Sequence, residues 1–115
     1  MNTTNMGNLE AGNRIEFRKA YSKLQGPIFT SLRKYNAENI GRYFDHQGHV
    51  FQVFIEGNFK FAAKLLQATR VNSANLSTAF VSYDCDGDLE TMRDFFSNSQ
   101  DYILLILQRD QKGSE

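Results

Sequence analysis

The apolar residues in the first third of the chain recur at the three- and four-residue steps of a helix. Between residues 13 and 35 these positions are Ile15, Phe17, Ala20, Tyr21, Leu24, Ile28, Phe29, Leu32 and Tyr35. Gly26-Pro27 interrupts the pattern, because Gly ends helices and Pro suits a first helical turn. The spacing therefore predicts helices at about 13–25 and 27–35. Asn36 is a good helix cap, so we expect a third short helix from Ala37 to Phe44.

Three later stretches have the composition of β-strands. Residues 49–56 and 102–108 are runs of β-branched, aromatic and aliphatic side chains, which are typical of strands that are buried on both faces. Apolar and polar residues alternate from Leu76 to Tyr83, and this pattern predicts another strand. Residues 88–97 are expected to form a helix, because one side of it would carry Leu89, Met92, Phe95 and Phe96.

The segment at 59–69 fits two structures. A strand would alternate its apolar residues and form a hairpin through Gly57-Asn58, with Phe59, Phe61, Ala63 and Leu65 on one face. A helix would instead gather Phe61, Ala62, Leu65 and Leu66 on one face. Ala, Lys, Leu and Gln are strong helix formers, so we interpret the segment as a helix.

These elements predict an α/β fold in a single domain over residues 13–110. Three N-terminal helical segments would precede a β-α-β-α-β order, and strands that alternate with helices favour parallel pairing. We expect a small three-stranded sheet with helices packed on it. If residues 59–66 form a strand, the fold becomes α+β with a mainly antiparallel sheet. Residues 1–12 and 111–115 are polar and are expected to be disordered or flexible tails.

The composition is that of an ordinary globular domain. A chain of 115 residues, 41% of them hydrophobic, can bury a core without a metal ion or a disulfide. Its single cysteine, Cys85, cannot form an internal disulfide. The N-terminus lacks the pattern of a signal peptide, and the apolar run Ile103–Leu107 is too short to cross a bilayer. We therefore expect a cytoplasmic protein without a membrane partner.

Charge is balanced over the chain, with 13 basic and 13 acidic residues, but it is unevenly distributed. Basic residues dominate between residues 13 and 34, and acidic residues dominate between 84 and 101. The basic segment is a candidate contact for nucleic-acid phosphates or an acidic protein partner through Arg14, Arg18, Lys19, Lys23, Arg33 and Lys34. The zero net charge and the absence of a nucleic-acid motif count against nucleic acid, and a solvated basic face explains the same residues without any ligand.

The acidic turn at 84–90 is a candidate site for a hard cation, Mg²⁺ or Ca²⁺. Oxygen ligands would come from Asp84, Asp86, Asp88 and, at the same edge of a parallel sheet, Glu56. Over about six residues the turn is similar to the Asp-x-Asp-Gly-Thr motif of haloacid-dehalogenase phosphohydrolases, which implies metal-dependent phosphate chemistry, but Asp88 stands in place of Thr and the match is too short to assign that family. A helix start explains the same residues without any ligand, because Asp and Gly form turns and acids favour a helix N-terminus.

The sequence contains no readable Ser-His-Asp or Cys-His arrangement, Gly-rich phosphate loop or zinc pattern. Its dipolar charge and its ten Phe residues suit contact with another protein. We therefore expect a small non-enzymatic protein-interaction or regulatory module that can also self-associate as a homodimer. The alternatives are a divalent-cation-binding or phosphate-handling protein that uses the acidic turn, and a weak nucleic-acid binder that uses the basic segment.

Overall fold

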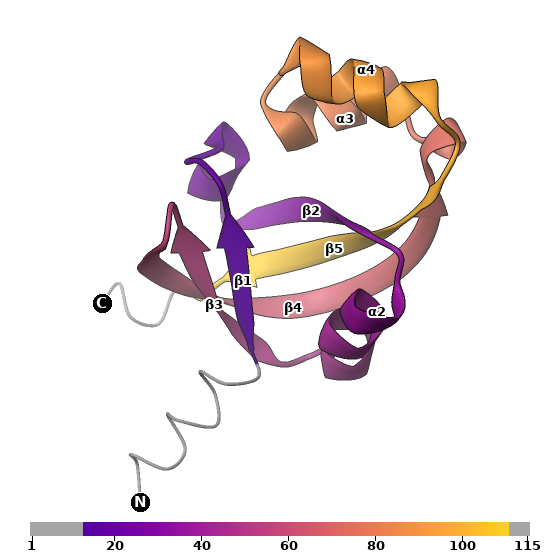
Figure 1. The fold of residues 1–115 in the computed structure, drawn as a ribbon. Coiled ribbons are helices and arrows are strands. Elements are labelled where there is room, and N and C mark those ends of the chain that lie inside the picture. Colours follow the sequence, from indigo (N-terminus) through magenta and orange to yellow (C-terminus); the bar gives the residue numbers. More distant parts are fainter. Residues whose placement is uncertain (1–12, 111–115) are drawn as a thin grey trace, which may run out of the picture.

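The computed structural model describes residues 13–110, and a five-stranded curled sheet forms its centre (Figure 1). The strands are β1 (Arg14–Phe17), β2 (Ile28–Lys34), β3 (Val50–Ile55), β4 (Asn58–Asn72) and β5 (Asp101–Arg109). They lie in the order β1-β3-β4-β5-β2. Neighbouring strands are antiparallel except β1 and β3, which are parallel. The two edge strands, β1 and β2, are therefore consecutive in the sequence. The predicted tails at 1–12 and 111–115 lie outside the described residues.

Helices cover two parts of the sheet. Helix α2 (Ala37–Tyr43) lies at one end, while α3 (Thr78–Cys85) and α4 (Leu89–Ser97) form a layer at the other end (Figure 1). Three short 3-10 turns, η1 (Ser22–Gln25), η2 (Phe44–His46) and η3 (Ser73–Asn75), connect the elements. The α3–α4 layer packs on β2 and β5 through a small apolar cluster of Val81, Cys85 and Phe95 with Leu32 and Tyr102. Within residues 13–110, no helix is long and apolar enough to cross a membrane.

The main hydrophobic core lies on the inner face of the curled sheet. Alternate residues of the strands point inward, and the most deeply buried are Phe29, Phe51, Val53, Ala63, Leu65, Ile103, Leu105 and Leu107. The curl brings the two edge strands toward each other, so that the rings of Phe17 in β1 and Phe29 in β2 are 6.2 Å apart. Strands β1 and β2 nevertheless do not pair in the described chain. We call the gap between these two edges the seam.

The predicted helices at 13–25 and 27–35 are wrong, because these residues form β1, η1 and β2. The error has a physical cause in β2. Polar Ser31 is buried on the inner face of the strand, while Leu32 packs outward under the α3–α4 layer. An edge strand covered in this way loses the alternation of apolar and polar residues that identifies strands. The helix expected at 37–44 is present as α2, with the Asn36 side chain capping the amide of Asn39.

The predicted α/β fold with a three-stranded sheet is also wrong, and the fold is a mixed α+β domain with five strands. The segment at 59–69 belongs to β4, which forms a hairpin with β3, as in the α+β alternative. A register shift between Leu65 and Gln67 moves the next buried residue to Ala68. Such a bulge breaks the two-residue period, and the helix-forming composition of the segment then outweighs the strand signal.

The strand predicted from Leu76 to Tyr83 is wrong as well, since residues 78–85 form helix α3. Ser77 caps this helix by accepting a hydrogen bond from the amide of Phe80. The buried residues Val81 and Cys85 are four positions apart, which is a helical spacing. The elements predicted at 49–56, 88–97 and 102–108 are found as β3, α4 and β5.

Substitution of two adjacent leucines in β4 distinguishes the strand from the helix that the sequence favours. The Leu65 side chain is fully buried, whereas that of Leu66 is 41% exposed on the opposite face. We expect Leu65→Ala to lower the free energy of unfolding by about 2–5 kcal/mol and Leu66→Ala by less than about 1 kcal/mol, as measured in urea. A helix would bury both residues, so equal losses would contradict the position of β4.

Candidate ligand-binding cleft

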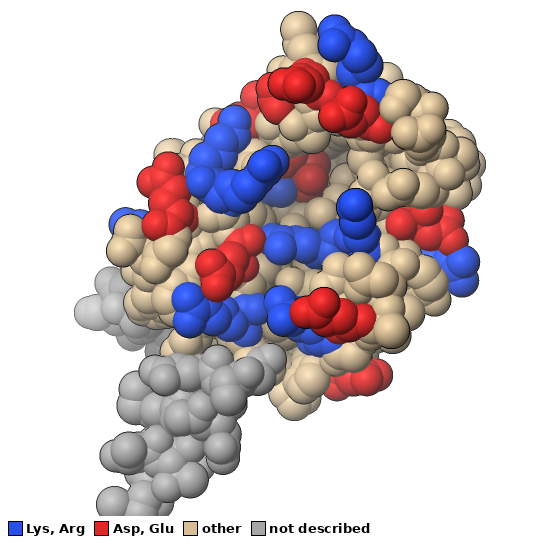
Figure 2. All heavy atoms as spheres, in the orientation of Figure 1, with Lys and Arg blue, Asp and Glu red and all other residues tan. Residues whose placement is uncertain are grey.

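A cleft with a volume of about 310 Å³ lies at the seam, beside the C-terminal end of α3. It is lined by Glu16, Phe17, Arg18, Tyr21, Lys23, Ser31, Leu32, Arg33, Asp84 and Cys85. A second hollow of about 250 Å³ shares Arg18, Tyr21 and Cys85 with it and adds Lys19, Asp88 and Thr91. Figure 2 shows a hollow here, with acidic side chains on the helical layer above it and basic side chains beside and below it. We call the two hollows together the seam cleft.

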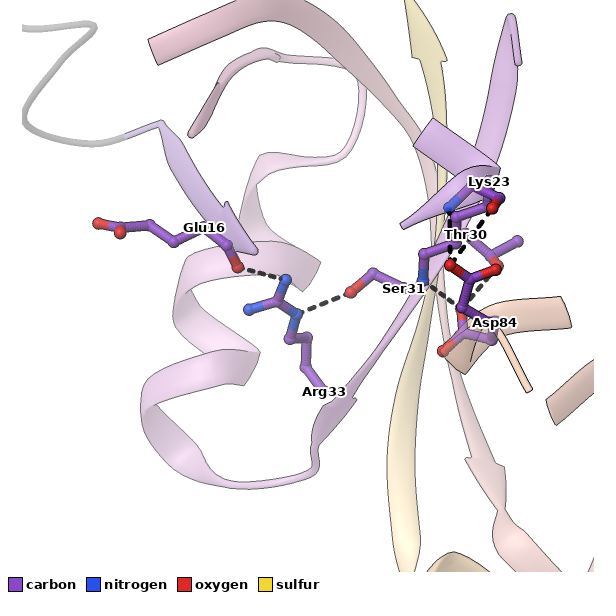
Figure 3. Close-up of polar contacts among 8 residues, drawn as sticks. Glu16, Lys23, Thr30, Ser31, Arg33 and Asp84 are labelled. Atoms are coloured by element: carbon purple, nitrogen blue, oxygen red, sulfur yellow. Dashed lines mark hydrogen bonds and ion pairs between the residues drawn. The ribbon is translucent and has the colours of Figure 1, made fainter. Parts of the chain in front are cut away.

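A buried ion pair crosses one end of the seam cleft. Lys23 of η1 and Asp84 of α3 are joined by a contact of 2.7 Å between Nζ and Oδ1, and their side chains are only 3% and 11% exposed. The same carboxylate oxygen accepts a hydrogen bond of 2.7 Å from the hydroxyl of Thr30 in β2 (Figure 3). This one oxygen atom of α3 therefore links the helical layer to η1, which lies between β1 and β2, and to the edge strand β2.

Burial is the main influence on the ionisation of Lys23. It lowers the pKa of Lys23 below the ordinary value of 10.5, although the charge and the hydrogen bond of Asp84 raise the pKa in part. The positive charge of Arg33 lowers it further. Removing one member of such a pair leaves the other charge buried without a partner, which costs more than the intact pair contributes. The seam cleft therefore depends on both residues being present.

Arg33 extends across the seam from β2 to β1. Its Nη2 donates to the backbone carbonyl of Glu16 at 2.9 Å, and its Nε donates to the Ser31 hydroxyl at 2.8 Å (Figure 3). The guanidinium carbon also lies 5.1 Å from the centre of the Phe17 ring. Among residues 13–110, Arg33 has no carboxylate partner, so its charge is not neutralised by a direct ion pair.

Two more cations at the rim of the cleft are without a direct ion pair. Arg18 is exposed and makes no hydrogen bond or ion pair with any other described residue. Lys19 lies 5.0 Å above the Tyr21 ring and forms no salt bridge within the described chain. The seam cleft thus has three cations, Arg18, Lys19 and Arg33, that can accept an anionic ligand.

The acidic residues near the cleft, by contrast, already have partners. Glu16 pairs with Arg14 at 2.9 Å. Asp86 accepts hydrogen bonds of 3.2 Å from both the amide and the hydroxyl of Ser22. Asp88 accepts from the hydroxyl of Thr91, and this bond holds the pKa of Asp88 below its usual range. The two hollows are lined by four cations and three acids, so the local balance is one positive charge, although the net charge of the chain is zero.

The structure does not gather the four residues predicted to bind a metal ion. Asp84 is bound to Lys23, Asp86 ends α3 in a left-handed conformation (φ 62°), and Asp88 precedes α4. Glu56 lies in the turn between β3 and β4. In the part of the chain that the structure describes, no three His, Cys, Asp or Glu side chains are grouped so that they could hold a metal ion.

The six predicted basic contacts divide into two sets. Arg18, Lys19, Lys23 and Arg33 line the seam cleft, although Lys23 is occupied by Asp84. Arg14 instead pairs with Glu16 and stacks on the ring of Phe54, and Lys34 lines a separate hollow. Sequence reasoning missed Ser31 and Leu32 as lining residues. Ser31 and Arg33 lie on the same face only if residues 28–34 form a strand. The helix predicted for this segment placed them on different faces.

No protein-family model, curated protein or solved structure matches this chain. The chemistry of the seam cleft is therefore the basis for assigning a function. Among the described residues, its lining contains four cations, three carboxylates, several hydroxyls and two aromatic rings but no histidine. The Cys85 thiol is directed at the backbone oxygen of Asp88 at 3.8 Å. This set of groups is suited to binding a carboxylate or another anion.

Removing the charge of Lys23 tests the buried ion pair. We expect Lys23→Met to lower the free energy of unfolding by about 3–5 kcal/mol, because the carboxylate of Asp84 stays buried without its cation. The double variant Lys23→Met/Asp84→Leu should regain most of that loss. The matched control is Arg42→Met, which breaks an exposed ion pair with Glu38 and should cost less than about 1 kcal/mol. If Lys23→Met and Arg42→Met lower the free energy of unfolding equally, the Lys23–Asp84 pair is exposed to solvent and the account of it as buried is wrong.

The lowered pKa of Lys23 makes the stability of the protein depend on pH. Between this lowered pKa and 10.5 the unfolded chain binds more protons than the folded chain, so deprotonation of Lys23 stabilises the fold as the pH rises. We expect the free energy of unfolding of the native protein, relative to Lys23→Met/Asp84→Leu, to increase from neutral pH toward pH 10.5. A decrease over this window would mean that pairing with Asp84 outweighs burial.

Proposed function

We propose that this protein is a non-enzymatic interaction module that binds an acidic segment of a partner protein in the seam cleft. The proposal rests on which charged side chains of the cleft are paired and which are not. Within residues 13–110, Arg18, Lys19 and Arg33 form no ion pair, whereas the lining acids Glu16 and Asp84 are already paired. Complementary charge across an interface determines which partner is selected and how fast it associates.

The lining also suits a peptide in size and in polarity. A volume of about 310 Å³ lies at the lower end of the range for ligand pockets and admits a few side chains. Arg33 uses two of the five N–H donors of a guanidinium for Ser31 and Glu16, which leaves donors for a carboxylate. The rings of Phe17 and Tyr21 provide apolar contact for the stems of acidic side chains.

A protein partner is favoured over nucleic acid by the distribution of the charges. Proteins that bind the phosphate backbone use a continuous stripe of many cations. Here the free cations surround one hollow that also contains Asp84, while Lys23 and Arg14 are held in ion pairs. This arrangement fits a ligand with a few carboxylates better than it fits a long polyanion.

Selection from a library of random heptapeptides, followed by a charge reversal, tests the proposal. We expect the native protein to select peptides rich in Asp and Glu, with binding that weakens as salt is added. Arg18→Glu should weaken the affinity for the selected peptides by at least about tenfold, because it replaces an attractive charge with a repulsive one. The control is Arg42→Glu, which makes the same charge change on the exposed face of α2.

Selection of neutral or basic peptides would contradict the proposal, and so would equal effects of Arg18→Glu and Arg42→Glu. A fluorescently labelled single-stranded RNA is the competing probe. RNA binding that exceeds peptide binding and is lost in Arg18→Glu would assign the cleft to nucleic acid instead.

A further inference from the structure

We infer that the acidic partner segment binds as an added β-strand between β1 and β2, and this inference rests on the proposed function. Adding a strand to an exposed edge is a common way for a sheet to bind an extended peptide. Here the added strand would meet two edges at once. Three features of the seam support this mode of binding: the backbone groups that face it, the side chain that now occupies it and the free cations beside it.

Strand β1 directs half of its backbone groups into the seam. The carbonyls of Asn13 and Phe17 accept hydrogen bonds of 2.8 and 2.9 Å from the amides of Gln52 and Glu56 on the β3 side. Since alternate residues of a strand direct their backbone groups to opposite edges, those of Arg14 and Glu16 point away from β3. Within residues 13–110, neither residue has a backbone partner on that edge.

Strand β2 is open on the facing edge. The carbonyl of Pro27 accepts from the amide of Arg109 at 2.7 Å, and the amide of Tyr35 donates to the carbonyl of Asp101 at 3.3 Å. Odd-numbered residues of β2 are therefore bonded to β5, and the backbone groups of Ile28, Thr30 and Leu32 face the seam. The described chain supplies no strand on this side of β2.

The side chain of Arg33 occupies the position of a missing strand. Its Nη2 donates to the carbonyl of Glu16, which is the kind of acceptor that a paired strand would use (Figure 3). Directly paired strands lie about 4.8 Å apart and leave no room for an arginine side chain between their backbones. The seam is therefore wider than one strand spacing. The backbone of a ligand can take over the carbonyl of Glu16 and release the guanidinium to bind a ligand carboxylate.

The free cations determine the sequence pattern of the ligand. In an added strand, every second side chain points to the same face. The face toward the seam cleft meets Arg18 and Arg33, so acidic residues should recur at every second position of the bound peptide. Because β1 contains only four residues, the paired core of the ligand should be about four residues long.

Two matched pairs of reagents test strand addition, with the tightest heptapeptide from the selection as the probe. N-methylation of the peptide backbone within its acidic core should weaken binding by at least about tenfold, while N-methylation of a flanking residue should not. On the protein, Glu16→Pro removes the amide that faces the seam and leaves the β1–β3 ladder intact, since Pro is tolerated in an edge strand. It should weaken binding by at least about tenfold relative to Glu16→Ala.

Hydrogen exchange followed by NMR reports the mode of binding directly. On addition of the peptide, the amides of Glu16 and Leu32 should become protected from exchange. If the peptide binds and requires Arg18, but N-methylation has no effect and these amides stay unprotected, strand addition is wrong while the proposed function stands. If acidic peptides do not bind, or bind Arg18→Glu equally well, the proposed function is wrong and this inference falls with it.

Discussion

The buried ion pair between Lys23 and Asp84 is the interaction on which the rest of the structure depends. Strands β1 and β2 are consecutive and antiparallel, an arrangement that usually gives a paired hairpin. Their connection instead enters the interior at η1, where Leu24 joins the main core and Lys23 meets Asp84 at 2.7 Å. Because Lys23 is buried and bound to α3, this connection is held against the helical layer instead of forming a tight hairpin turn. The seam and its cleft follow from this one placement.

The same placement determines the electrostatics of the surface. Acidic side chains of the segment at 84–101 make contacts within the molecule. Asp84 binds Lys23 and Thr30, and Asp86 binds Ser22. The basic segment is only partly used, since Arg18 and Arg33 have no carboxylate partner in the described chain. A chain with zero net charge thereby presents a locally positive cleft, and the charge of this cleft rather than the total charge determines the kind of ligand it can bind.

The sequence predicts best those elements whose apolar residues follow one regular pattern. Strand β5 is a continuous apolar run and helix α4 has its apolar residues at helical spacing, and both were predictable from these residues. Strand β2 has a polar inner residue, Ser31, and an apolar outer one, Leu32, because helices cover its outer face. This burial pattern results from tertiary contacts, so rules that use only the local sequence do not identify the strand. The candidate site was predictable in part, since Arg18 and Arg33 were recognised as basic contacts, but the seam that brings them together depends on the strand order.

The hydrogen exchange of single amides in the free protein tests the open seam most directly. We predict that the amides of Glu16 and Leu32, which face the seam, exchange at least about a hundredfold faster than those of Phe17 and Ser31, which are bonded to β3 and β5. Equal protection of all four amides would show that β1 and β2 are paired, and it would contradict both the seam and the ligand mode built on it.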